Sequence, residues 1–174
     1  MNQQILANKN VIKKQLFNNK IDYSNIRIEG NDFDDNIWRM GNKNLKFDIF
    51  NDRPIMINQV KKYLLKQYIK NSVSTLIRKF DGVKFFANFI NFYYPHIKEF
   101  EDLNGIIINR YFNHIITFKY KAGFKKSHPE GKKLSRTSLN KNSTFLKELF
   151  HEGIRKKWID KEKKFIDELK RLQD

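Results

Sequence analysis

The chain has 174 residues, of which 40% are hydrophobic, and a net charge of +16, so it has material for one folded domain with an extension and is not wholly disordered. No apolar run approaches the roughly 18 residues of a membrane span, the first residues are too polar for a signal peptide, and the absence of cysteine excludes disulfides and thiolate chemistry. We therefore expect a cytoplasmic protein without a membrane partner.

Residues 1–52 are expected to form an irregular or weakly β N-terminal extension, because they lack a long helical stripe of apolar residues. Turn signals at Gly30-Asn31 and Gly41-Asn42 bracket short segments within it. Three apolar side chains are expected to dock on the main body, namely Trp38, Phe47 and Ile49. A nearby acidic cluster lacks the Gly and the distal Glu of a calcium loop and is interpreted as a solvated turn, formed by Asp32, Asp34 and Asp35.

Residues 53–174 are expected to form an all-α domain, a compact bundle of four to five helices. Apolar residues recur there at helical spacing and predict helices near 54–69, 74–93, 104–121, 135–153 and 160–172. Pro54 suits a first helical position, Pro95 stops the second helix, and Gly123 is the expected C-cap of the third. The stripes expected to face the core are Ile57, Val60, Leu64 and Tyr68, then Leu76, Phe80, Val83, Ala87 and Ile90, then Ile107, Tyr111, Ile115 and Phe118, then Leu139, Leu146, Leu149 and Phe150, and finally Phe165, Leu169 and Leu172.

The positive charge is concentrated in one part of the chain. Residues 61–160 carry 21 basic and 8 acidic side chains, whereas residues 1–60 carry 9 and 7 and residues 161–174 carry 5 and 4. Between residues 103 and 147 there are ten basic side chains and a single acid, Glu130. A concentrated positive field attracts polyanions, and the commonest of these in the cytosol is nucleic acid.

Patterns typical of catalysis or metal binding are missing from the sequence. The four histidines are scattered and form no HExxH pair, and the sequence contains neither a phosphate-binding loop nor a GxGxxG motif. His114 lies beside a helical stripe and is interpreted as a partly buried structural residue. We expect no catalytic residue, no metal, no cofactor and no small-molecule substrate.

Two predicted helix starts share one composition. The segments NSVSTLIRK (71–79) and KLSRTSLNK (133–141) each place Ser or Thr at the start of a helix and Arg or Lys within the next turn. Ser at such a position is an ordinary N-cap, but the free amides of a helix N-terminus also favour phosphate. Because both starts lie in the region of excess charge, we favour duplex DNA as the partner. Arg and Lys would reach phosphates or base edges.

Several short motifs follow one another in a fixed order along the chain. Their residues are Ser74, Thr75, Phe86 and Phe89, then Asp102, Leu103, Ile107 and Tyr111, then Ser135, Ser138, Leu139, Leu146, Leu149 and Phe150, and finally Trp158. This order of motifs resembles the N-terminal core-binding domain of tyrosine recombinases, the phage integrases. The upstream segment IWRMGNKNLKFDIFNDRPIMINQVKKYLLKQYIK also resembles the linker and first helix of integrase-like transposase subunits, so that the resemblance covers residues 36–160.

This resemblance implies a SAM-like helical bundle that clamps one face of a recombination site beside other recombinase subunits. It also implies that two helix starts lie against double-stranded DNA, through Asn71, Ser72, Ser74, Thr75, Arg78 and Lys79 and through Lys133, Ser135, Arg136, Thr137, Asn140 and Lys141. The family's catalytic half, with its Arg, Lys, HxxR motif and tyrosine nucleophile, would follow and is missing. We therefore expect no enzyme activity from this chain. It would be either the N-terminal half of a longer site-specific recombinase or a stand-alone relative.

The sequence is also compatible with two other functions. One is a helical protein–protein adaptor with a basic surface, and the other is an RNA-binding helical module. Single-strand binders expose aromatic stacking platforms, whereas most phenylalanines here lie on inward stripes. Exposed aromatic residues without bordering basic residues would favour the adaptor.

Overall fold

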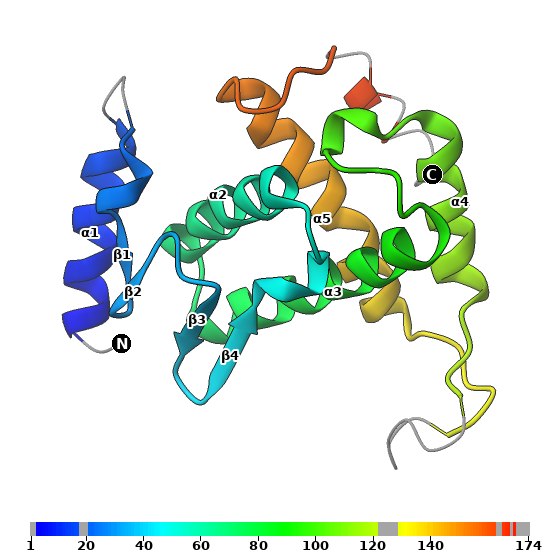
Figure 1. Cartoon of the computed structure of the whole chain (residues 1–174). Coiled ribbons are helices and arrows are strands. Elements are labelled where there is room, and N and C mark those ends of the chain that lie inside the picture. The colour runs from blue at the N-terminus through cyan, green and yellow to red at the C-terminus, as the bar shows by residue number, and fades with distance from the viewer. Residues whose placement is uncertain (1–2, 18–20, 122–128, 163–164, 168, 170–174) are drawn as a thin grey trace. The chain divides into compact units, whose positions relative to one another are not determined.

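The computed structural model describes residues 3–17, 21–121, 129–162, 165–167 and 169. The chain is mostly helical and contains two small antiparallel sheets (Figure 1). It divides into two compact units, residues 1–80 and 81–174, and the division falls within the long helix α3 (Val73–Tyr93). The domain boundary expected after residue 52 stays a prediction. Within the described ranges, no helix combines the length and the apolarity that crossing a bilayer requires.

The first unit contains a helix that the sequence interpretation missed. Helix α1 (Gln3–Phe17) occupies 15 residues of the segment expected to be irregular or weakly β, and that expectation is wrong for these residues. The residues of α1 that are buried are Lys9 and Ile12, so a polar side chain takes a place in the buried stripe. The Lys9 ammonium donates a hydrogen bond to the Asn71 carbonyl, and it lies 5.0 Å from the centre of the Tyr68 ring. This contact fastens α1 to the C-terminal end of α2 (Pro54–Lys70).

Two short hairpins lie between α1 and α2. Strand β1 (Arg27–Ile28) pairs with β2 (Asn31–Asp32), and β3 (Ile37–Met40) pairs with β4 (Lys43–Lys46), both antiparallel. The expected turn at Gly41-Asn42 is confirmed, because it joins β3 and β4. The first turn consists of Glu29 and Gly30, one residue earlier than predicted, because Asn31 already pairs with Ile28 in β2. Buried and exposed residues alternate along β3, as a sheet with one face on a core requires. The 3-10 helices η1 (Tyr23–Asn25) and η2 (Phe47–Phe50) flank these hairpins.

Aromatic rings join these hairpins to the helices of the first unit. Trp38 and Phe47 are fully buried, and the Phe47 ring lies 5.6 Å from the ring of Phe80 in α3. The predicted docking is therefore confirmed for Phe47. Trp38 packs on Phe47, with ring centres 5.0 Å apart, and Ile49 is only half-buried. Beneath the hairpins, the buried Lys61 of α2 places its ammonium 5.0 Å from the centre of the Phe47 ring. Burial lowers the pKa of Lys61, and the nearby Asp34 and Asp35 partly offset that effect.

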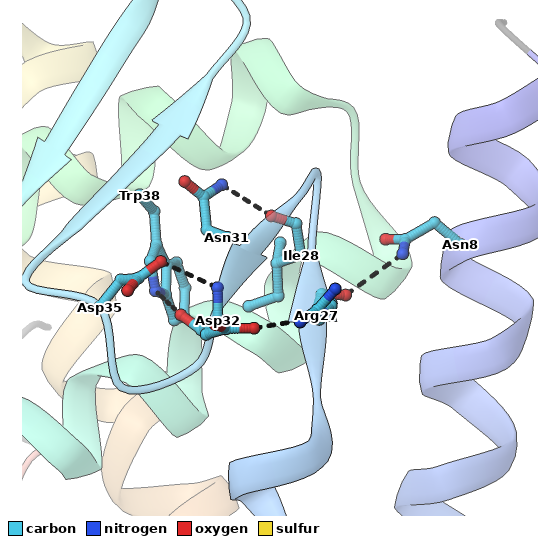
Figure 2. A network of polar contacts seen from close by, with 7 residues as sticks. All are labelled: Asn8, Arg27, Ile28, Asn31, Asp32, Asp35 and Trp38. Atoms are coloured by element: carbon cyan, nitrogen blue, oxygen red, sulfur yellow. Dashed lines mark hydrogen bonds and ion pairs between the residues drawn. The ribbon is translucent and has the colours of Figure 1, made fainter.

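The acidic cluster forms an exposed turn that holds the hairpins together (Figure 2). The Asp32 carboxylate accepts a hydrogen bond from Arg27 Nε at 2.9 Å, and its backbone N–H donates to Asp35 Oδ2 at 2.9 Å. The Asp32 carbonyl accepts a hydrogen bond from Trp38 Nε1 at 3.2 Å. The buried Asn31 amide donates to the Ile28 carbonyl at 2.7 Å and so closes the first hairpin. The carboxylates of Asp32 and Asp35 are thus engaged in the local structure of the turn.

The second unit contains the rest of α3, the 3-10 helix η3 (Phe100–Asp102), α4 (Gly105–Thr117) and α5 (Arg136–Arg155). The helices expected near 54–69, 74–93 and 135–153 are confirmed within two residues by α2, α3 and α5. Pro54 does stand in the first turn of α2, and α3 ends two residues before Pro95.

Two predicted boundaries are wrong. Helix α4 ends at Thr117 and not near 121, because the chain becomes extended at Phe118 and Lys119 then forms a β-bridge with Lys133. Gly123, the expected C-cap, lies outside the described residues. The last helix does not begin at 160, because residues 160–162 are not helical. Residues 165–167 and 169 are helical, and the remainder of that segment lies outside the described residues.

The core of the second unit is a cluster of aromatic rings around Phe86. Its ring lies 5.8 Å from Phe100, 5.1 Å from Tyr111 and 5.4 Å from Phe145, between ring centres. Nearly all of the predicted stripe residues in both units are buried. The exceptions are the half-buried Ile57, Phe118 and Leu139, together with Leu172, which lies outside the described residues.

Candidate nucleic-acid interface

The start of α3 uses two of its predicted site residues for capping. Ser72 Oγ accepts the Thr75 N–H at 3.2 Å, and the Ser72 carbonyl accepts the Leu76 N–H at 3.0 Å, so Ser72 is the N-cap. The Asn71 amide donates to the Gln67 carbonyl at 2.9 Å at the end of α2. These polar groups are therefore committed to helix ends before any ligand binds.

The other predicted residues of this start lie further along α3. Ser74 and Arg78 are exposed, and Thr75 and Lys79 are half-buried. Ser74 and Arg78 are four residues apart, so they lie on the same side of the helix, one turn from each other. This spacing leaves one hydroxyl and one guanidinium facing solvent.

The start of α5 in the second unit has the same local design. Ser135 Oγ accepts the Ser138 N–H at 3.2 Å, which makes Ser135 the N-cap of the helix. The preceding Leu134 is buried and fixes the point at which the chain enters the helix. The residues that remain exposed around this cap are Lys133, Arg136, Thr137 and Asn140.

Within the part of the chain that the structure describes, two cationic side chains of this start are unpaired. Among the described residues, neither the exposed Arg136 nor the half-buried Lys141 forms an ion pair or a side-chain hydrogen bond. Arg136 lies in the first turn of α5, where the backbone dipole already favours negative charge, and Lys141 lies in the next turn. An anion at this point would meet positive groups that need not first break an internal contact.

A close approach of α3 fixes the position of α5. A Cβ at Gly82 of α3 would stand 3.0 Å from the Lys141 carbonyl oxygen, which is tighter than most real Cβ contacts, so a larger residue would push the two backbones slightly apart. The buried Tyr111 hydroxyl donates to the Asn142 carbonyl at 2.7 Å. Burial raises the pKa of Tyr111 well above its ordinary value, so the phenol stays protonated and keeps donating. The side-chain Oδ1 of Asn142 is buried and has no hydrogen-bond partner among the described residues.

The predicted residues thus lie at two separate helix starts. Those of α3 belong to the first unit as far as Lys79, and those of α5 belong to the second. Within each start the residues occupy the cap and the first turns of their own helix. The single DNA-facing surface expected to combine both starts stays a prediction.

A third group of cations was not singled out in the sequence. Lys119 and Lys121 are exposed on an extended segment that pairs with the segment of the exposed Lys132 and Lys133. The alternation of aromatic and basic residues in FKYK (118–121) was the signal that could have identified it, because it has the period of a strand. The helical spacing of the preceding apolar residues predicts a helix through this segment instead.

His114 lies in a cage of aromatic rings, as a structural residue would. Its ring is 5.8 Å from Phe85, 5.2 Å from Phe89, 5.5 Å from Tyr93 and 5.9 Å from Phe118. The side chain is half-buried, which confirms the prediction. Burial lowers the pKa of His114 below its ordinary value of 6.5, because the cage cannot solvate an imidazolium. His128 lies outside the described residues.

We expect this cage to make stability depend on pH. His114 binds a proton more readily in the unfolded chain than in the folded chain. The folded state is therefore stabilised by the neutral His114 above about pH 6.5, and this contribution to the free energy of unfolding is lost as the pH falls below that value. The melting temperature should therefore fall between pH 7.5 and pH 5, and His114→Gln should reduce that slope. His96→Gln, which changes an exposed ring, is the control. Equal slopes in His114→Gln and the unchanged protein would contradict this account.

Comparisons with known proteins identified no relative of this chain. No family model matches the chain, and no match was found among curated proteins or solved structures. In the described part of the chain, no group of three or more His, Asp or Glu side chains is arranged to hold a metal ion. The functional conclusion therefore depends on the helix starts, on the charge around them and on the resemblance in motif order.

Proposed function

We propose that this chain binds duplex DNA sequence-specifically as the N-terminal core-binding domain of an integrase-type or transposase-type tyrosine recombinase. In this role its SAM-like bundle clamps the recombination site in the cytoplasm, beside other recombinase subunits. A separate C-terminal catalytic domain cuts the strands, and this chain has no strand-cleaving activity of its own. The order of motifs across residues 36–160 supports the choice of family.

One observation carries the DNA-binding part of the proposal. At the start of α5, Arg136 is exposed beside a capped helix end and has no partner among the described residues. It belongs to the stretch between residues 103 and 147, which has ten basic side chains and one acid. Phosphates are attracted to such a field from any direction. An arginine on the first turn of a helix can also form a bidentate contact with guanine in the major groove.

Alanine substitutions at the α5 start test this proposal. Lys141→Ala should weaken binding to all duplexes evenly and make the slope of log K against log salt about 0.9 less steep, as a lost phosphate contact does. Arg136→Ala should cost roughly 1–3 kcal/mol on the preferred site and relax sequence preference there, as a lost base contact does. Fluorescence anisotropy on a selected site and on a scrambled duplex measures both effects.

The matched control is a pair of exposed lysines on a helix in the near-neutral part of the chain. Lys13→Ala and Lys14→Ala remove charge from α1 and should leave affinity almost unchanged. If these variants lose as much affinity as Arg136→Ala, the attraction is diffuse and α5 does not form the interface. Tighter binding to an RNA hairpin than to duplex DNA would favour the RNA-binding function instead.

A protein–protein adaptor is the second candidate, and one observation favours it. Phe92 and Tyr93 at the end of α3 are 78% and 51% exposed, with their rings 4.7 Å apart. Exposed aromatic pairs of this kind are typical of protein interfaces. Under the proposed function, a neighbouring recombinase subunit would cover them. Phe92→Ala should then leave the affinity of the isolated chain for short duplexes unchanged.

A further inference from the structure

Two extended basic segments joined by a β-bridge precede α5 in the second unit. They present four exposed lysines, Lys119, Lys121, Lys132 and Lys133, which we call the lysine ribbon. Lys119 and Lys133 are antiparallel bridge partners, and the Tyr120 N–H donates to the Lys132 carbonyl at 3.0 Å. Gly131, with a φ of +76°, supplies the left-handed residue of the tight turn that begins at Pro129.

Aromatic packing fixes which side of the lysine ribbon faces solvent. Tyr120 is 9% exposed, and its ring lies 5.5 Å from the ring of Phe118, which in turn lies 5.0 Å from Phe85 of α3. Leu134, at the end of the other strand, is also buried. Because side chains alternate along a strand, burial of Tyr120 directs Lys119 and Lys121 outward. The lysines are therefore presented from a fixed backbone.

The lysine ribbon carries an electrostatic cost in the free protein. The hydrogen bond from Tyr120 makes Lys119 and Lys133 a non-hydrogen-bonded pair, the kind in which facing side chains come closest, with Cβ atoms about 4.5–5.5 Å apart. Like charges facing each other in this way are destabilising. None of the four ammonium groups forms an ion pair with an acid among the described residues. An external polyanion would offset the repulsion, whereas a neutral partner would not.

We propose that the lysine ribbon is a second DNA-contacting element, which grips the phosphate backbone of the duplex bound by α5. This inference rests on the proposed function. The chain runs directly from Lys133 to the Ser135 cap, so the ribbon and the opening turn of α5 are covalently adjacent. Phosphate is the expected contact because flexible ammonium groups act as point charges and carry little geometric specificity. The ribbon therefore adds affinity to the interface and no sequence preference.

The double variant Lys119→Gln/Lys121→Gln tests this inference in the full chain. At 0.1 M salt, affinity for any short duplex should fall about 60-fold, and the slope of log K against log salt should become about 1.8 less steep, because two phosphate contacts are lost. The melting temperature at low salt should stay the same or rise, because a like-charge repulsion is removed. The matched control is Lys43→Gln/Lys46→Gln, which removes two exposed lysines from the β3–β4 hairpin and should change affinity little.

Each alternative outcome overturns the inference in a recognisable way. If the control variant loses as much affinity as the ribbon variant, attraction is diffuse. If the ribbon variant binds normally while Arg136→Ala does not, the lysine ribbon is not a contact and the proposed function stands. A falling melting temperature together with the lost affinity means that the lysines are structural. If the unchanged chain binds no duplex at 50 mM salt, both proposals fail. If the unchanged chain instead binds an RNA hairpin and the ribbon variant does not, RNA replaces DNA as the ligand.

Discussion

Replacing Phe86 with alanine is expected to lower the free energy of unfolding by about 3–5 kcal/mol. The Phe86 ring is fully buried and contacts the rings of Phe100, Tyr111 and Phe145, which come from three other segments of the second unit. Truncation removes the transfer free energy of the ring and leaves a cavity that these rigid neighbours fill only in part. Since domains are typically stable by 5–15 kcal/mol, the second unit would become marginal.

A urea titration followed by circular dichroism measures this loss. The control is Phe92→Ala in the same helix, because the Phe92 side chain is 78% exposed. It should change stability by less than about 0.5 kcal/mol. The ring cluster would not be the core of this unit if both variants unfolded at the same urea concentration.

Binding of duplex DNA is expected to weaken steeply with salt. The two helix starts carry five cationic side chains, Arg78, Lys79, Lys133, Arg136 and Lys141. If each neutralises one phosphate, the slope of log K against log salt is about −4.5, which corresponds to a loss of about 500-fold between 50 and 200 mM salt. The lysine ribbon would make the slope steeper still.

Anisotropy titrations at several potassium chloride concentrations measure this slope on a labelled duplex of about 20 base pairs. The same oligonucleotide as a single strand is the comparison, because each phosphate contact contributes less to the slope there, about −0.7. A duplex slope shallower than about −2 would mean that at most two phosphates are contacted. The two helix starts would then not form a DNA interface.

The helices with continuous apolar stripes could be predicted from the sequence, and those stabilised in other ways could not. Helices α2, α3 and α5 have stripes of large apolar residues, and their bounds were predicted within two residues. Helix α1 buries Lys9 beside Ile12, and the lysine satisfies a carbonyl at the end of α2. A tertiary contact of this kind leaves no periodic signal. The early end of α4 likewise depends on a bridge to Lys133, which is 14 residues further along the chain than Lys119.

For the candidate site, the caps could be predicted and the orientation of charges could not. Ser135 followed by a helical stripe already indicated an N-cap. Whether Arg136 faces solvent depends on which side of α5 is buried. Leu139 is only half-buried, so it defines the buried side less clearly than the buried Leu146 does. The sequence contains the cations of the lysine ribbon, but the exposed side that Lys119, Lys121 and Lys133 share follows from the pairing of two segments. Such pairing is decided by tertiary structure.

The backbone contact at Gly82 limits how far α5 would have to change its conformation when a duplex binds. The helices meet there without an intervening side chain, and the Tyr111 hydroxyl holds the next carbonyl of α5. Fixing one residue of backbone costs about 1–2 kcal/mol of conformational entropy, and this chain incurs that cost during folding. Docking at the opening turn would then immobilise only side chains such as Arg136. The complex would assemble at a rate set by diffusional encounter and electrostatic steering, without a slow conformational step.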